Sequence, residues 1–131
     1  MADYTKLNLR GVEDAAKKFG MPEGLESRFA REALELDNQG LTLFTLAPNF
    51  RIPFGHRHKE QEEVYVVLSG SGRVKLDDEL ADVRPWDVVR VAPGTFRGFA
   101  AGPEGLELLA IGSDRPEGGD GVQSDDDWWG D

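Results

Sequence analysis

The sequence predicts an all-β protein, built as a β-sandwich or a closed barrel. Between residues 41 and 111, short apolar runs alternate with turn residues such as Pro, Gly, Asn and Asp. Short strands at nearly regular spacing are typical of sandwiches and barrels. No strand–helix–strand alternation is visible, which argues against a parallel α/β sheet. The length of 131 residues suits one domain with its own core.

Residues 1–40 form an N-terminal extension in two segments. The first, residues 12–19, predicts a short helix, because Gly20 and Pro22 follow it as helix-ending residues. In the second, apolar residues recur at helical spacing, so periodicity alone predicts a helix there too. These residues are Leu25, Phe29, Ala33 and Leu36.

The strands predicted in the barrel region, residues 41–111, are each followed by turn residues. They cover residues 41–47, 64–68, 73–76, 80–83, 88–91, 96–100 and 106–111. Gly70-Ser71-Gly72 is expected to form a hairpin turn between two of them. The Gly-Pro-Glu-Gly sequence at 102–105 is expected to form another turn.

Residues 112–131 predict an acidic tail that is flexible or only loosely docked. The tail has seven acidic residues against one base, Arg115, and so carries more than half of the chain's net charge of −10. Its acids are Asp114, Glu117, Asp120, Asp125, Asp126, Asp127 and Asp131. Trp128 and Trp129 are expected to cover the protein's own surface or a dimer mate; alternatively they form a lid or a hook for a partner.

Charge and composition exclude several classes of protein. A chain this acidic is unsuited to nucleic acid or to an anionic membrane surface. The absence of Cys excludes disulfides, thiolate zinc sites, iron–sulfur clusters and a cysteine nucleophile. Residues 1–10 have no apolar signal-peptide core and no apolar run is long enough to span a bilayer, so a cytoplasmic protein is expected.

The chain has two histidines, His56 and His58, which lie two residues apart in a β-rich region. On a strand such residues face the same side. Glu63 follows five residues later, at the start of a predicted strand. Two imidazoles and a carboxylate form a set that binds first-row transition metals and leaves coordination positions open. These three residues are therefore the candidate metal ligands.

The segment from 49 to 70 resembles the first sequence motif of the cupin superfamily. The residues that fall at the motif's intervals are His56, His58, Glu63 and Gly70. The motif's leading Gly is absent: strict counting gives Phe50, and one residue earlier is Asn49. Asn tolerates the left-handed conformation that Gly would supply, so the turn is expected to be kept.

A second cupin-like motif follows from residue 86 to residue 101. It aligns through Asp87, Pro93 and Gly94, with Trp86 or Asp87 at its Gly position. Ala101 stands at its Asn position, and Arg97 stands where the family has a fourth metal ligand. The resemblance implies a double-stranded β-helix, or jelly roll, which is usually a homodimer with its site inside the barrel. It also makes residues 28–33 a strand that joins the barrel rather than a helix.

Arg97 leaves two arrangements open, because a guanidinium is always cationic and cannot ligate a metal. It pairs with Glu63 and takes the metal's place, or it turns toward the barrel mouth and binds an anionic group of a substrate. Tyr65 shares the strand face of Glu63, and Phe99 shares that of Arg97. Tyr65, Phe99 and Arg97 are therefore the candidate substrate-binding residues.

These observations predict a small cupin that binds a small anionic organic ligand in its barrel. A divalent metal (Fe, Mn, Ni or Zn) on His56, His58 and Glu63 would give it oxygenase, isomerase or decarboxylase chemistry. The alternative is a metal-free binding or structural cupin in which Arg97 pairs with Glu63. The fold by itself does not decide between them.

Overall fold

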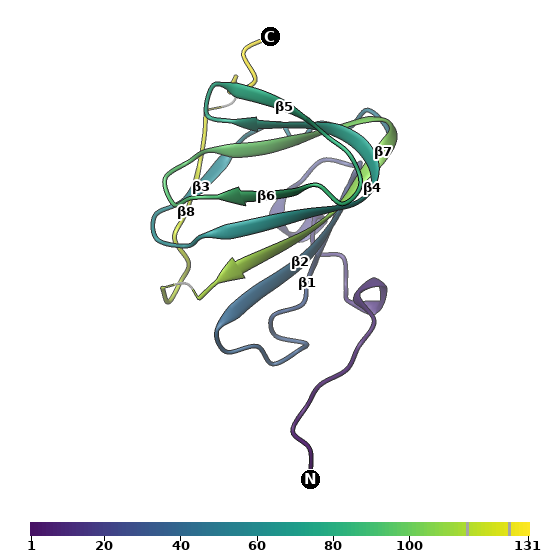
Figure 1. Ribbon diagram of the computed structural model, residues 1–131, viewed down its shortest axis with the longest axis vertical. Coiled ribbons are helices and arrows are strands. Elements are labelled where there is room, and N and C mark those ends of the chain that lie inside the picture. Colours follow the sequence, from purple (N-terminus) through teal and green to yellow (C-terminus); the bar gives the residue numbers. More distant parts are fainter. Residues whose placement is uncertain (115, 126) are drawn as a thin grey trace.

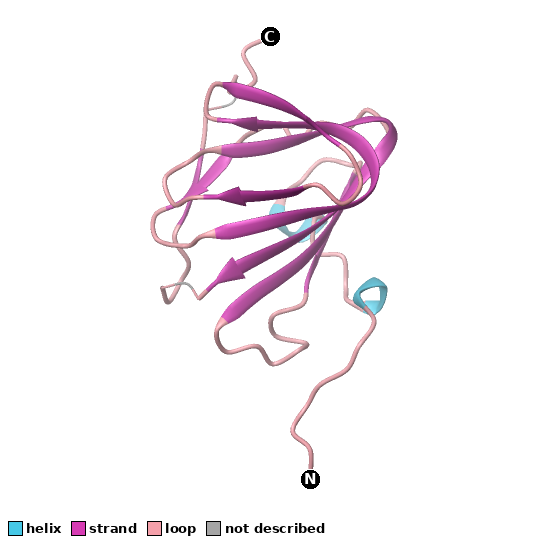
Figure 2. Cartoon of the chain, viewed as in Figure 1, coloured by secondary structure: helices cyan, strands magenta, loops and turns pink. Residues whose placement is uncertain are grey.

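The computed structural model describes residues 1–114, 116–125 and 127–131, and these form an almost entirely β structure (Figure 2). Two 3-10 helices, Leu9–Gly11 and Lys17–Phe19, precede the sheet. The strands are β1 (Leu25–Phe29), β2 (Gln39–Leu46), β3 (His56–His58), β4 (Glu63–Leu76), β5 (Glu79–Val83), β6 (Val88–Val91), β7 (Arg97–Ser113) and β8 (Gly121–Gln123). The all-β prediction is confirmed.

Two long antiparallel strands, β4 and β7, run through both layers of the molecule (Figure 1). The first half of β4 pairs with the second half of β7, and β2, β1 and β6 extend this layer. The second half of β4 pairs with the first half of β7, and β5, β3 and β8 extend the other layer. This curled pair of layers is the expected jelly roll.

The expected hairpin at Gly70-Ser71-Gly72 is wrong: this segment is a bend inside β4. Residues 102–105 likewise lie inside β7. A Cβ on Gly70, whose φ is +84°, would lie 2.0 Å from the carbonyl oxygen of Gly105. A Cβ on Gly72 would lie 2.1 Å from the carbonyl oxygen of Ala100. Glycine at these positions lets the two strands bend together while they remain paired.

Two residues with left-handed backbone conformations stand where the cupin motifs have Gly. Asn49 has a φ of 61°, which confirms that it supplies the turn expected of the first motif's Gly. Trp86 has a φ of 73°, and so it, rather than Asp87, takes the Gly position of the second motif. The Asp87 carboxylate instead accepts a hydrogen bond from the backbone N–H of Arg84.

The N-terminal extension is less helical than its periodicity predicts. Within residues 12–19 helical structure is confined to Lys17–Phe19, which ends at Gly20 with a φ of 71°. β1 pairs with β2, so a strand does join the barrel, but it ends at Phe29 and residues 31–35 form a turn. The apolar spacing therefore reflects a strand followed by a turn, and pairing with β2 outweighs the local helical pattern.

The C-terminal segment lies along the barrel in its described residues. β8 pairs with β3, and the Trp129 indole N–H donates to the carbonyl oxygen of Ile52 at 2.7 Å. Trp128 packs where Gly55 and Gly98 leave room for its ring. The two tryptophans thus cover the protein's own barrel, as expected. Flexibility of the tail stays a prediction, and Arg115 and Asp126 lie outside the described residues.

The inner faces of both layers share one apolar core. Its fully buried side chains include Leu46, Val67, Val74, Val91 and Leu108. Within the described residues, no helix has the length and apolar character that a membrane span requires. The candidate site lies beside this core, where β3 and β8 meet the first residues of β4 and β7.

Candidate functional site

His56, His58 and Glu63 converge, as their spacing predicts. The histidines begin and end β3, and Glu63 begins β4. One potential ligand atom from each lies within 4.8 Å of the others. Glu63 Oε1 is 3.1 Å from His58 Nε2 and 3.5 Å from His56 Nε2. The His56 side chain is 37% exposed against 15% for His58, so the site opens to solvent on the His56 side.

The carboxylate of Glu63 is held in its ionised form by its neighbours. The Tyr65 hydroxyl donates to Glu63 Oε1 at 2.7 Å. Burial alone would raise the pKa of Glu63, but hydrogen bonds from His56, His58 and Tyr65 outweigh it and bring the pKa well below its usual range. Burial and the nearby Glu63 charge raise the pKa of Tyr65 well above its usual range, so its hydroxyl remains a donor.

Asp120, from the C-terminal segment, is a site residue that the sequence analysis did not single out. Its side chain is 3% exposed, and Oδ1 lies 2.9 Å from His58 Nδ1. Oδ2 accepts from the backbone N–H groups of Glu60 at 2.7 Å and Gln61 at 2.9 Å. Burial would raise its pKa, but these donors and His58 lower it to about 2. In the sequence it is one acid among seven in the tail, and its one distinguishing signal is its place between glycines.

His58 therefore lies between two carboxylates, with Nδ1 toward Asp120 and Nε2 toward Glu63. A carboxylate only accepts hydrogen bonds, so Asp120 selects the form of His58 with a proton on Nδ1. Burial lowers the pKa of His58, but the two carboxylates outweigh it and raise the pKa. Either a second proton or a metal cation satisfies Nε2 beside Glu63. A carboxylate on the far nitrogen is the usual support of a metal-ligating histidine, so this donor set fits a divalent transition metal.

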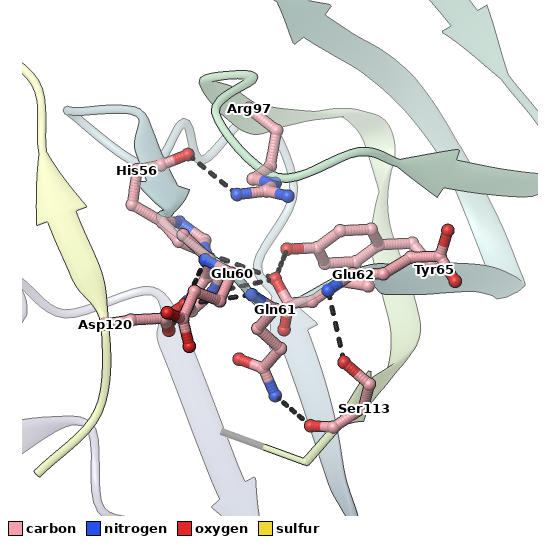
Figure 3. Close-up of polar contacts among 10 residues, drawn as sticks. His56, Glu60, Gln61, Glu62, Tyr65, Arg97, Ser113 and Asp120 are labelled. Carbon is pink, nitrogen blue, oxygen red and sulfur yellow. Dashed lines mark hydrogen bonds and ion pairs between the residues drawn. The ribbon is translucent and has the colours of Figure 1, made fainter. Parts of the chain in front are cut away.

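Arg97, the first residue of β7, is fully buried. Its Nη1 donates to the carbonyl oxygen of His56 at 3.2 Å (Figure 3). Among the described residues, Glu63 forms its ion pairs with the histidines and not with Arg97. The arrangement in which Arg97 takes the metal's place on Glu63 is therefore not the one observed. Two other guanidinium nitrogens, Nε and Nη2, have no hydrogen-bond partner in the part of the chain that the structure describes.

A cavity of about 190 Å³ adjoins this cluster. His56, Tyr65, Arg97 and Phe99 line it, together with apolar residues of the two layers and the N-terminal segment. The rings of Tyr65 and Phe99 pack with centroids 4.9 Å apart. The structure thus brings all three candidate substrate-binding residues to one cavity beside the three candidate metal ligands. Binding of a metal or a ligand by these six residues stays a prediction.

A family model described as "Cupin domain" matches residues 42–112. This chain belongs to the cupin family. The match spans both motifs and the strands that carry the site, so the resemblance seen in the sequence is confirmed. No curated protein matches the chain.

Solved structures of other cupins share the fold. A cupin protein from Bacteroides fragilis is 24% identical, with a TM-score of 0.71 over 87% of this chain and 86% of that chain. A sugar phosphate isomerase of the cupin superfamily from Silicibacter pomeroyi is 20% identical, with a TM-score of 0.72 over 94% of each chain. An oxalate decarboxylase from Bacillus subtilis is 23% identical, with a TM-score of 0.72 over 92% of this chain and 32% of that chain. These similarities concern the fold.

Proposed function

We propose that this cupin binds a divalent first-row transition metal through His56, His58 and Glu63, and a small organic anion beside it on Arg97. The observation that carries the proposal is the position of His58 between two carboxylates. With its Nδ1 proton directed to Asp120, His58 offers the lone pair of Nε2 to a cation that Glu63 also faces. Fe, Mn, Ni and Zn all accept such a donor set.

A bound metal would polarise an oxygen of the ligand and orient it through open coordination positions. The chain's own residues have separate tasks. Asp120 orients His58, and the Tyr65 hydroxyl helps keep Glu63 ionised. Arg97 offers to an anionic group the two nitrogens that have no partner within residues 1–114, 116–125 and 127–131. The buried rings of Tyr65 and Phe99 shield one side of the bound ligand from water, whereas Phe19 and Phe29 line the cavity but are exposed.

The reaction classes that suit this site are oxygenation, isomerisation and decarboxylation of an organic acid. An isomerase and a decarboxylase among the structural neighbours support two of these classes. A metal-free binding protein is the second candidate function. One observation favours it: the Glu63 carboxylate already contacts both histidines and accepts a hydrogen bond from the Tyr65 hydroxyl. Its negative charge therefore has partners without a metal ion.

Metal titration of the purified full chain separates these functions. Wild-type protein is expected to bind Mn(II) or Ni(II) at one site in calorimetry. His58→Ala should weaken binding by more than the roughly 10- to 100-fold that loss of an outer-shell partner costs. Glu62→Gln is the matched control, because Glu62 neighbours Glu63 but is exposed and faces Arg90. Equal affinities in wild type and His58→Ala would contradict the metal site and favour the metal-free function.

A further inference from the structure

The lining of the 190 Å³ cavity is mostly aromatic and aliphatic. Its aromatic side chains are Phe19, Phe29, Phe44, Phe54, Tyr65 and Phe99. Among its described lining residues, polar side-chain atoms come from Ser27, His56, Tyr65 and Arg97. His56 and Tyr65 are already directed at Glu63, and Ser27 lies on β1 in the other layer from Arg97. Of these four residues, Arg97 is the one with buried side-chain nitrogens that have no hydrogen-bond partner among the described residues.

The buried guanidinium of Arg97 lacks hydrogen-bond acceptors for two of its nitrogens among the described residues. The residue is fully buried, and its Nε and Nη2 have no partner among the described residues. A buried donor without a partner is costly, and a charged one more so. A planar carboxylate satisfies two N–H groups of a guanidinium at once through parallel hydrogen bonds. One carboxylate would thus supply what this side chain lacks.

We infer that the ligand is a monocarboxylic acid with an apolar body the size of one ring. Its carboxylate would lie on Arg97, beside the metal site, and its body among the phenylalanines. The inference rests on the proposed function in taking Arg97 as the anion-binding residue, and adds the chemistry of the remainder of the ligand. In size, a cavity of about 150 Å³ accommodates benzene, so this larger one accommodates a ring with a short acid-bearing arm.

A more polar ligand would not suit the same walls. A dicarboxylate or a polyol would bring further charges or hydroxyls against phenyl rings, where they lose their hydration without finding partners. Binding of an apolar ring instead removes apolar surface of both the ring and the cavity from water, and the ring packs against aromatic edges and faces. The lining thus selects for an acid with one charged end.

The experiment titrates the full chain with three compounds. Any metal is first removed with a chelator, so that no ion binds the compounds. They are phenylacetate, its neutral analogue 2-phenylethanol, and oxalate as an acid without an apolar body. Calorimetry should show phenylacetate binding at least about tenfold more tightly than either of the others, since charge-assisted hydrogen bonds and ring burial both contribute. Arg97→Met, which keeps apolar bulk and removes the charge, should lower phenylacetate affinity by a similar factor.

The three ligands distinguish the possible failures even if Arg97→Met does not fold. If oxalate binds as tightly as phenylacetate, Arg97 receives anions as proposed but the apolar-body inference is overturned. If 2-phenylethanol binds as tightly as phenylacetate, or a folded Arg97→Met keeps full affinity, the anion site of the proposed function fails as well. The absence of binding by all three compounds overturns both.

Discussion

Asp120 controls which nitrogen of His58 carries a proton, and this contact links the C-terminal segment to the candidate metal site. Its two oxygens have different tasks: Oδ1 faces His58, and Oδ2 accepts from two backbone N–H groups. The backbone donors fix the carboxylate, and the fixed carboxylate in turn fixes the imidazole. Orientation of this kind is what an outer-shell residue contributes to a metal centre.

Asp120→Asn should therefore weaken metal binding by roughly 10- to 100-fold while the protein stays folded. The amide oxygen takes the place of Oδ2 and keeps both backbone donors, so the amide NH₂ faces His58 Nδ1. The histidine must then accept at Nδ1 and carry its proton on Nε2, where the metal would bind. Nitrogen NMR of the imidazole reports the change of tautomer, and calorimetry reports the affinity. Unchanged affinity together with the changed tautomer would show that Asp120 does not support a metal ligand.

The site residues that could be predicted from the sequence are those set by local spacing. His56 and His58 share a strand face, and Glu63 and Tyr65 share the next, so strand periodicity places all four. The partnership of Arg97 could not be decided, because it depends on how far two strands lie apart. Asp120 could not be identified, because it is separated by 62 residues from His58 and its contact is formed by tertiary folding.

At the scale of the elements, turn residues mark where the chain bends but not whether it reverses. The glycines at 70 and 72 have the composition of a hairpin, yet β4 continues through them and changes layer. The partner strand decides whether the chain reverses or continues here. β7 bends at the same place and brings its own backbone into contact with these glycines. Such long-range pairing is absent from any local window of sequence.

The Asp14 carboxylate is one of several contacts that hold the N-terminal segment against β1, and it gives a prediction about pH. Asp14 Oδ1 accepts from the backbone N–H groups of Ala16 at 3.0 Å and Ser27 at 2.9 Å. These two bonds lower the pKa of Asp14. Asp14→Ala should reduce the free energy of unfolding by about 1–2 kcal/mol at pH 7 in urea denaturation.

The stabilising effect of the Asp14 charge should depend on pH in one direction. A carboxyl whose pKa is lowered by folding stabilises the protein above its unfolded pKa, and this effect is lost as pH falls through the folded pKa. Asp14→Asn keeps an acceptor oxygen and removes only the charge. The difference in stability between wild type and Asp14→Asn should therefore be largest at neutral pH and shrink below about pH 4. A difference that grows on acidification would contradict this role of Asp14.

At the scale of the whole molecule, the candidate site is assembled from three distant parts of the chain. β3 and β4 supply the proposed ligands, β7 supplies Arg97, and the C-terminal segment supplies Asp120 and the tryptophans that pack over Gly55 and Gly98. The segment is further held by a two-pronged ion pair between Arg51 and Asp131, at 2.6 and 2.9 Å. Figure 1 shows it running along one side of the barrel from β8 toward the C-terminus, which lies at the opposite end of the molecule from the N-terminus.

The jelly-roll class could be predicted because regular turn spacing and two motif spacings agree on it. The path of the C-terminal segment could not, since its acidic and glycine-rich composition is that of a solvated tail. Its contacts are a short pairing with β3, two indole rings and a few charged groups, none of which forms a local pattern. The homodimer that the family resemblance implies stays a prediction.

The most direct measurement of the metal centre is anomalous diffraction from crystals of the full chain grown with Mn(II). The expected result is one strong anomalous peak at coordination distance from Nε2 of His56, Nε2 of His58 and the carboxylate of Glu63. His58 Nδ1 should still be hydrogen-bonded to Asp120. The contradicting result is the absence of a peak among these three residues at saturating Mn(II), with Glu63 still bonded to the histidines and Tyr65.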